Sequence, residues 1–146
     1  MDKKESLLYE NEYFRIEHAR AFRIPGYLFV CSKKDIYSLT DLSQDAIVSL
    51  GLTLSTAVKA VETIIKPINI YYAKFGETGH PLHFHILPRT QWLTDIYLKE
   101  TSEPFVSGPL LLDWVDAKFL KGKAIINKEQ EIQVVMVELK HYFEDL

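Results

Sequence analysis

The feature of this sequence that most constrains its fold is the alternation of histidine with apolar side chains in GHPLHFHILPR, residues 79–89. Because side chains alternate between the two faces of a β-strand, His83 and His85 are expected to share one face, about 7 Å apart. The apolar side chains expected on the other face, under a covering helix, are Leu82, Phe84 and Ile86. The stretch therefore predicts a strand with one buried apolar face and two neighbouring imidazoles on the opposite face.

Strand-forming composition predicts a hairpin around this stretch and three strands before it. Residues 68–75 are rich in Ile and Tyr, and the turn GETG at 76–79 leads back into the histidine strand. Nearer the N-terminus, residues 6–18 predict two short strands joined at Glu10–Asn11, and the apolar run at 26–32 predicts a third.

A long amphipathic helix is predicted at residues 43–65. Ser43 is a suitable N-cap, and Pro67 ends the helix because the residue before a proline avoids the helical region. The apolar positions recur at steps of three and four, as one face of a helix requires. They are Ile47, Leu50, Leu54, Val58, Val61 and Ile65.

The C-terminal third is expected to be mainly helical. Residues 92–100 predict a weak strand, and residues 107–120 predict a short helix. A last helix is expected at about 127–144, opened by a capping box of Asn127 with Gln130. The order of strands, helix, strands and helices favours an α+β fold with an antiparallel sheet.

Composition excludes several classes of protein. The chain has 146 residues, which suits one domain, and a net charge of −3, which gives no electrostatic reason to expect a nucleic-acid polymer or an anionic membrane as partner. Its single cysteine, Cys31, allows no internal disulfide. No segment resembles a signal peptide and no apolar run approaches the ~20 residues of a membrane span, so we expect a cytoplasmic protein.

Two neighbouring histidines are compatible with three kinds of site. A neutral imidazole can attack phosphorus while its neighbour donates a hydrogen bond. Two histidines on a strand can also bind a metal, with a third ligand from His80, His18 or a distant carboxylate. Finally, the two side chains can simply form structural hydrogen bonds. The pair alone leaves all three open.

The longer context resembles a known family. LHFHILPR is similar to the signature of the histidine triad (HIT) family, His-x-His-x-His followed by two apolar residues and often Pro-Arg. Residues 24–42 also resemble the Pro-Gly-His strand and loop that precede the family's long helix. The resemblance covers about residues 6–100 of what we expect to be a single domain of residues 1–146, and leaves 101–146 as a helical extension.

The resemblance implies a fold and an activity. The fold would be α+β, with a five-stranded antiparallel sheet, a long helix on one face and a common homodimeric assembly. The activity would be hydrolysis or transfer at the α-phosphate of a nucleotide conjugate, for example a dinucleoside polyphosphate, with no metal or other cofactor. His83 would be the nucleophile that forms a covalent nucleotidyl-histidine, and His85 would contact phosphate or leaving-group oxygens.

The resemblance also implies residues that line the site or bind phosphate. They are Glu77, Thr78, Gly79, His80 and Arg89. Arginine suits phosphate geometry, although a structural ion pair is an equally good explanation of Arg89.

Three positions depart from the family pattern. Pro81 occupies the place of the first histidine, Tyr27 replaces the histidine of Pro-Gly-His, and Glu77 stands where many relatives place a glutamine. The alternative function is therefore a catalytically impaired nucleotide-binding protein of the same fold.

The proline raises specific expectations for the strand. We expect Pro81 to begin it, and His80 to face away from His83 unless a bulge turns it back. His83 would then be oriented by a backbone carbonyl or by a neighbouring side chain. We expect His18 at a strand edge and Cys31 in buried packing.

Overall fold

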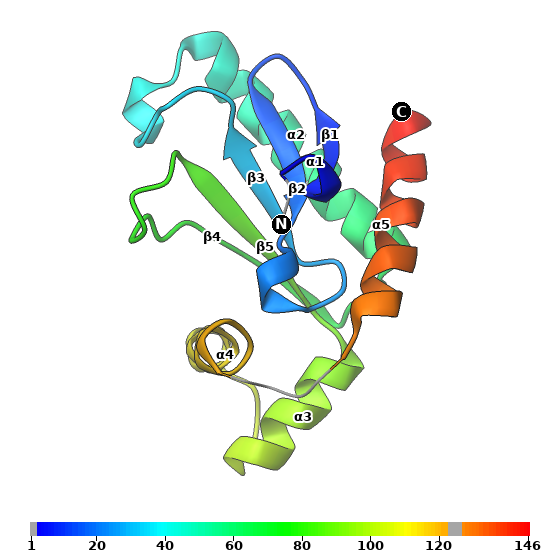
Figure 1. Ribbon diagram of the computed structural model, residues 1–146. Coiled ribbons are helices and arrows are strands. Elements are labelled where there is room, and N and C mark those ends of the chain that lie inside the picture. Colours follow the sequence, from blue (N-terminus) through cyan, green and yellow to red (C-terminus); the bar gives the residue numbers. More distant parts are fainter. Residues whose placement is uncertain (1–2, 123–126) are drawn as a thin grey trace.

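The computed structural model describes residues 3–122 and 127–146 (Figure 1). A five-stranded antiparallel sheet with the strand order β1-β2-β3-β5-β4 forms its centre, which confirms the predicted fold class. The strands are β1 Leu7–Glu10, β2 Phe14–His18, β3 Leu28–Ser32, β4 Asn69–Ala73 and β5 His83–Arg89. A short helix, α1 Lys3–Ser6, precedes the first strand.

The turn between β1 and β2 lies where the sequence predicts it. The side-chain oxygen of Asn11 accepts hydrogen bonds from the backbone N–H groups of Tyr13 and Phe14, at 3.0 and 2.9 Å. Asparagine stabilises turns in this way because its side chain imitates a backbone acceptor. The amide nitrogen of Asn11 also donates to Thr53 of the long helix, which fixes this end of the sheet against the helix.

The long helix α2, Gln44–Ile64, begins and ends close to the predicted bounds. The Ser43 hydroxyl accepts from the backbone N–H of Ala46 at 3.2 Å, as expected of an N-cap. Lys66 has a left-handed backbone conformation, with φ of 54°, just before Pro67. These two features end the helix.

The buried face of α2 is rotated from the predicted stripe. It is formed mostly by small residues, namely Ala46, Leu50, Thr53, Ala57, Ala60 and Val61. Small side chains let the helix approach the sheet closely. Of the predicted stripe, Leu54, Val58 and Ile65 are therefore only half-buried and Ile47 is 43% exposed.

Helix α2 is also long and apolar enough to cross a membrane, by length and composition alone. The helix contains no uninterrupted apolar run of the length expected for a membrane span, because Lys59, Glu62 and several Ser and Thr residues interrupt it. In the structure, Leu50, Ala57 and Val61 of this helix are buried against the sheet in the main hydrophobic core.

Helices cover one face of the sheet and one end of the other face. Helix α2 and the C-terminal helix α5, Glu129–Glu144, lie on one face, where Leu28, Val30 and Ile86 contribute to the core. A second apolar cluster lies at one end of the opposite face and joins Tyr27 and Leu87 to the helices described next. The face that carries His83 and His85 is therefore only partly covered.

The predicted strand at residues 92–100 is wrong. Residues Gln91–Thr101 form helix α3, which begins where the Thr90 hydroxyl accepts from the backbone N–H of Leu93. Trp, Ile and Tyr favour strands locally, but the buried Leu93 and Tyr97 are four residues apart, as on one side of a helix. Tertiary burial of that side decides the structure.

The remaining helices follow the prediction. Helix α4, Gly108–Val115, continues into a π-helical segment at Asp116–Lys121. Helix α5 has the expected bounds, although the capping box does not form. Its N-cap is Lys128, and the Asn127 side chain instead accepts from the backbone N–H of Glu129 at 3.1 Å.

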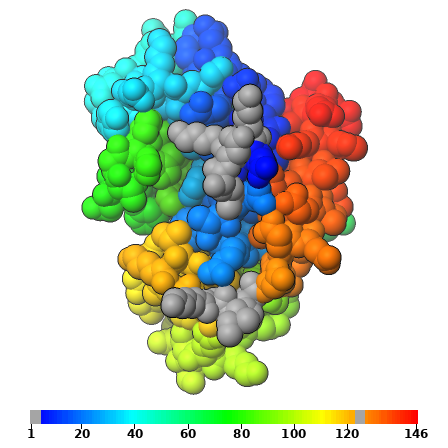
Figure 2. Space-filling view, in the orientation of Figure 1, coloured from blue at the N-terminus to red at the C-terminus, as the bar shows by residue number. Residues whose placement is uncertain are grey.

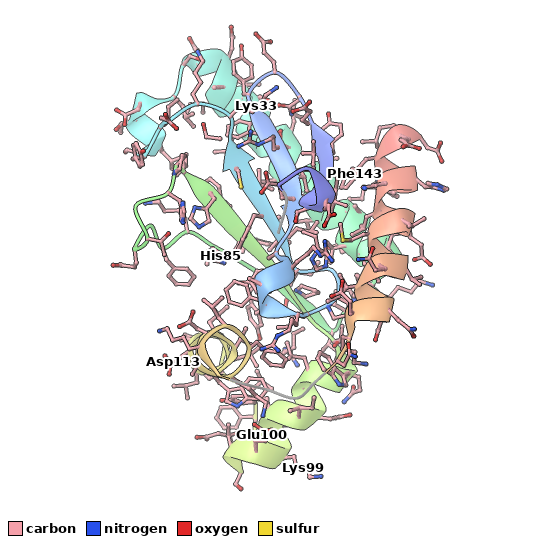
Figure 3. The ribbon with its side chains drawn as sticks, viewed as in Figure 1. Lys33, His85, Lys99, Glu100, Asp113 and Phe143 are labelled. Atoms are coloured by element: carbon pink, nitrogen blue, oxygen red, sulfur yellow. The ribbon has the colours of Figure 1, made fainter. Side chains whose placement is uncertain are left out.

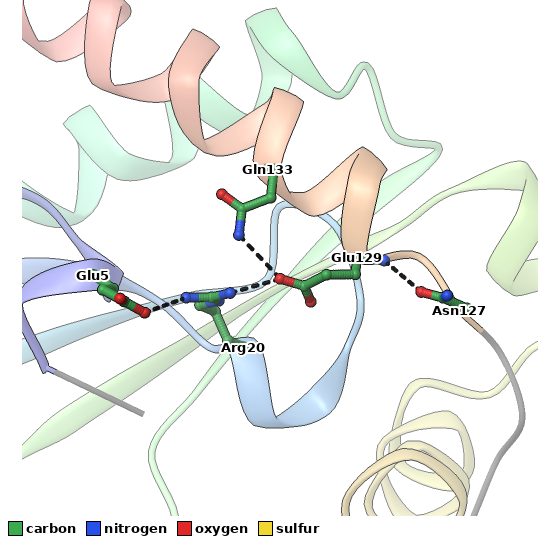
Figure 4. A network of polar contacts seen from close by, with 5 residues as sticks. All are labelled: Glu5, Arg20, Asn127, Glu129 and Gln133. Carbon is green, nitrogen blue, oxygen red and sulfur yellow. Dashed lines mark hydrogen bonds and ion pairs between the residues drawn. The ribbon is translucent and has the colours of Figure 1, made fainter.

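A polar network links the N-terminus to α5 (Figure 4). The Arg20 guanidinium, in the short 3-10 turn Arg20–Phe22, donates to Glu129 at 2.6 Å and to Glu5 at 3.3 Å. Gln133 also donates to Glu129, at 3.0 Å. The Gln133 and Arg20 hydrogen bonds lower the pKa of the Glu129 carboxyl, because both favour its charged form. In the space-filling view α5 forms one flank of the molecule, and α4 lies below the loop between β4 and β5 (Figure 2).

Candidate active site

The histidine strand starts later than predicted. Strand β5 begins at His83, so Pro81 lies two residues before it and does not open it. The backbone between them is nevertheless held by two hydrogen bonds, because the N–H of Leu82 donates to Ile36 at 2.6 Å and its carbonyl accepts from Ser32 at 2.8 Å. Proline has no N–H to donate, so it fits just outside this paired segment.

His83 and His85 share one face of the sheet, as predicted. Their ring centroids lie 5.2 Å apart, and in the pairing with β3 they stand opposite Cys31 and Phe29 respectively. Figure 3 shows His85 on β5. Cys31 is half-buried in this cross-strand position, so the expectation that it is buried is only partly correct.

His83 is oriented by the backbone. Its Nδ1 lies 3.0 Å from the carbonyl oxygen of Pro81. A carbonyl can only accept, so this contact places the ring proton on Nδ1 and leaves the lone pair on Nε2. A backbone carbonyl is one of the two kinds of partner that the sequence led us to expect for His83. The hydrogen bond makes Nε2 the available nucleophilic atom.

His85 is oriented by Tyr27. Its Nδ1 lies 2.7 Å from the Tyr27 hydroxyl, and Tyr27 is buried. Burial, together with the charge that His83 can carry, lowers the pKa of His85 to about 4, against a smaller opposite effect of Asp116. His85 is therefore uncharged at neutral pH.

Three phenylalanine rings surround the His85 ring. Their centroids lie 4.8 Å away for Phe29, 5.3 Å for Phe75 and 6.3 Å for Phe22, all edge to face. These three rings fix the plane of the imidazole and account for much of its burial. Phe75 is 51% exposed, so the His85 ring can be reached by a ligand from the side of Phe75.

The loop before β5 carries four of the predicted site residues. Glu77, Thr78, Gly79 and His80 are all exposed there. The His80 ring lies 6.5 Å from that of His83, so the expectation that it faces away was wrong. Regular strand alternation does not apply to His80, because the strand begins only at His83.

Arg89 is not brought to the histidine pair. Its guanidinium donates to the Tyr71 hydroxyl and to the Thr94 hydroxyl, both at 3.1 Å. Four residues of strand separate it from His85, which corresponds to ~13 Å. In the structure Arg89 links β4 to helix α3.

His18 lies in an inner strand of the sheet and not at its edge. It is 2% exposed, and its Nε2 accepts from the backbone N–H of Gly26 at 3.0 Å. Burial, with a smaller contribution from Arg20, lowers its pKa to about 4. It takes no part in the histidine pair.

Two site residues were missed as such from the sequence, Tyr27 and Phe75. Tyr27 had a usable signal, since it stands where the family pattern places a histidine. Neither the alternation of side chains along the strand nor the composition indicated that Phe75 belongs to the site. Its contact with His85 depends on how the loop after β4 folds back.

A shallow cavity of about 250 Å³ lies on the other side of β5. Its lining residues are Tyr37, Ser38, Leu39, Lys74, Leu82 and Phe84. Leu82 and Phe84 alternate with the two histidines, so this cavity does not open onto the imidazoles. Within residues 3–122 and 127–146, no cluster of three or more His, Cys, Asp or Glu side chains is placed to hold a metal ion.

Comparison with known proteins identifies the family. The sequence profile of the HIT domain matches residues 1–92, which is more than half of the chain. This chain belongs to the HIT family. No curated protein matches it significantly.

Solved structures share the fold at low sequence identity. A histidine triad protein from Bradyrhizobium japonicum is 16% identical, over 96% of this chain and 92% of that one, with a TM-score of 0.67. A HIT protein from Sinorhizobium meliloti is 15% identical, over 97% and 95%, with a TM-score of 0.65. The likeness therefore extends into the helices after residue 100.

A third similar structure is an enzyme. The diadenosine triphosphate hydrolase of Plasmodium falciparum, solved with cyclomarin A, is 17% identical over 82% of this chain and 81% of that one, with a TM-score of 0.56. At this identity the likeness concerns the fold alone.

Proposed function

We propose that this HIT protein is a nucleotide hydrolase or nucleotidyl transferase that acts at the α-phosphate of a nucleotide conjugate, such as a dinucleoside polyphosphate. The observation that carries the proposal is the orientation of His83. Its Nδ1 is held by the Pro81 carbonyl, so that the Nε2 lone pair is free to attack phosphorus. Membership of the HIT family and the likeness to a diadenosine triphosphate hydrolase support it.

The chemistry has two steps. In the first, Nε2 of His83 bonds to the α-phosphorus, and the bond from phosphorus to the leaving group breaks with its electron pair on the leaving atom. The Pro81 carbonyl then stabilises the positive charge of the nucleotidyl-imidazolium through Nδ1–H. In the second, water or another acceptor attacks phosphorus, the electron pair returns to Nε2, and the attacking group loses a proton to solvent.

Other residues would bind or position the substrate. The exposed loop of Glu77, Thr78, Gly79 and His80 lies beside His83 and would line the phosphate path. Arg89 would act indirectly, since its hydrogen bonds join β4 and α3 at the other end of β5 from His83.

We also propose a cytoplasmic homodimer. The apolar flank of α2, with Ile47 43% exposed, lies on the same side of the sheet as Tyr72 of edge strand β4, which is 64% exposed. Exposed apolar side chains on this side of the sheet provide surface that a dimer interface would bury.

A catalytically impaired nucleotide-binding protein is the second candidate, favoured by Pro81 and by the negative charge of Glu77 beside the phosphate path. A turnover panel of dinucleoside polyphosphates, adenosine phosphoramidate and nucleotide sugars separates the two. Turnover of one of these compounds that is lost in His83→Ala supports the enzyme. Nucleotide binding without turnover supports the impaired protein, and metal bound to the purified protein would support a metal module instead.

A further inference from the structure

We propose that Tyr27 holds His85 as the neutral tautomer with its proton on Nε2, and that the site therefore favours phosphoanhydrides over phosphoramidates. The inference rests on the proposed function, because it concerns the class of bond that the His83 nucleophile would break. Tyr27 is a positioning residue in this account, since it acts through His85 and not on the substrate.

The direction of the hydrogen bond follows from burial. The Tyr27 hydroxyl lies 2.7 Å from Nδ1 of His85 and, among the described residues, has no other hydrogen-bond partner. Tyr27 is 2% exposed, so water does not replace a missing acceptor. A buried hydroxyl proton without an acceptor is costly, so the hydroxyl donates to Nδ1. The ring proton of a neutral His85 is then on Nε2.

The surroundings keep both groups uncharged. Burial holds the pKa of His85 at about 4 and raises the pKa of Tyr27. The titratable groups that act on them are His83 on the same strand and Asp116 at the start of the π-helical segment. The Asp116 carboxylate is itself paired with Lys121, 2.8 Å away. His85 is therefore a hydrogen-bond donor and not an acid at neutral pH.

This state suits the cleavage of a phosphoanhydride. When Nε2 of His83 bonds to the α-phosphorus, the bond from phosphorus to the bridging oxygen breaks and the electron pair stays on that oxygen. The product is a phosphate anion, which needs no proton to leave. A hydrogen bond from Nε2–H of His85 to that oxygen stabilises the charge as it develops.

The same state does not suit a phosphoramidate. Its leaving nitrogen must gain a proton before or during departure, since an amide anion is a poor leaving group. If neutral His85 gave up its Nε2 proton, it would become an imidazolate, or Tyr27 would become a buried phenolate by passing its own proton to Nδ1. Either product places a negative charge on the Tyr27–His85 pair, whose burial favours the uncharged forms of both groups.

Substrate preference tests the consequence. With diadenosine triphosphate and adenosine 5′-phosphoramidate as probes, we expect kcat/KM to favour the anhydride by roughly tenfold or more, which corresponds to one protonation-dependent interaction in the transition state. A preference for the phosphoramidate would overturn the inference while the proposed function stood. Absence of turnover with every conjugate tested would overturn the proposed function and the inference together.

Nuclear magnetic resonance tests the tautomer without turnover. In protein labelled with ¹⁵N-histidine at neutral pH, the His85 signals should show a protonated Nε2 and an unprotonated Nδ1. A proton on Nδ1 would overturn the inference.

The variant Tyr27→Phe tests the cause. It should populate the other tautomer of His85 and lower kcat on the anhydride by roughly three- to tenfold, the size of one lost hydrogen bond, with less change in KM. Tyr142→Phe, on α5 at the opposite face of the sheet, is the matched control and should change neither. A Tyr27→Phe protein with the tautomer and kcat of the unaltered protein would overturn the inference.

Discussion

Nδ1 of His83 lies 3.0 Å from the carbonyl oxygen of Pro81, the residue that stands in place of the first histidine of the family pattern. The contact uses the backbone of Pro81 and not its side chain. The nucleophile can therefore keep its orientation although the first histidine is missing, because any residue at position 81 supplies a carbonyl.

Substitution of Pro81 should accordingly be tolerated. We expect Pro81→His to preserve or raise kcat on a nucleotide substrate. We expect Pro81→Ala to change kcat by no more than roughly threefold, which is smaller than the change expected if a strong hydrogen bond were lost. Steady-state kinetics with diadenosine triphosphate measure both. A loss as large as that of His83→Ala would show that the proline ring itself is required.

His80 should matter much less than His83. Its ring lies 6.5 Å from that of His83 but is exposed, and it has no place in the two chemical steps. We expect His80→Ala to lower kcat by less than roughly tenfold, as for a residue that does not touch the reacting atoms, whereas His83→Ala abolishes turnover in a folded protein. Equal damage from the two substitutions would place His80 within the catalytic machinery.

Stability should fall in mild acid because of His18. Its pKa is lowered from 6.5 to about 4 in the folded protein, so the unfolded chain binds more protons between these values. The free energy of unfolding therefore decreases as pH falls from about 6.5 to about 4, by up to about 3 kcal/mol from this group. His85 acts in the same direction.

The comparison of two variants isolates that contribution. In urea unfolding at several pH values, His18→Gln should show a flatter pH dependence than the unaltered protein, and its amide oxygen can still accept from Gly26. His141→Gln, on the exposed side of α5, controls for the loss of an imidazole. An equally steep pH dependence in His18→Gln would contradict the account.

Homodimer formation should depend on the apolar flank of α2. We expect a dimer in light scattering at micromolar concentration, and a monomer after Ile47→Glu, because a charge would be buried in the interface. Val137→Glu changes a comparably exposed side chain on α5, 54% exposed, and should leave the dimer intact. A monomeric unaltered protein would defeat the proposed assembly.

Local patterns were sufficient to predict much of the sheet and its main helix. The two-residue period around His83 and His85 placed both rings on one face, and Ser43 and Pro67 bounded α2 closely. These features depend on neighbours in the sequence, so the sequence carries them directly. The spacing of Leu93 and Tyr97 was also available, but strand-forming residues between them favoured the wrong element.

Tertiary contacts decided the features that could not be predicted. The hydrogen bond between Tyr27 and His85 joins residues 58 positions apart, and no local pattern reports it. The rotation of α2 toward Ala57 and Ala60 depends on how closely the helix approaches the sheet. The late start of β5 depends on the hydrogen-bond partners of Leu82, which are Ser32 at the end of β3 and Ile36 in the loop after it.

The central claim is that His83 forms a covalent bond to the α-phosphorus, and trapping that intermediate tests it most directly. Protein mixed with diadenosine triphosphate is quenched within the first turnover, and intact-mass and peptide mass spectrometry locate any added group. The account predicts one adenylyl group on the peptide that contains His83, and none on the His83→Ala protein under the same conditions. Rapid turnover without an adenylylated protein, or an adenylyl group on a residue other than His83, would contradict it.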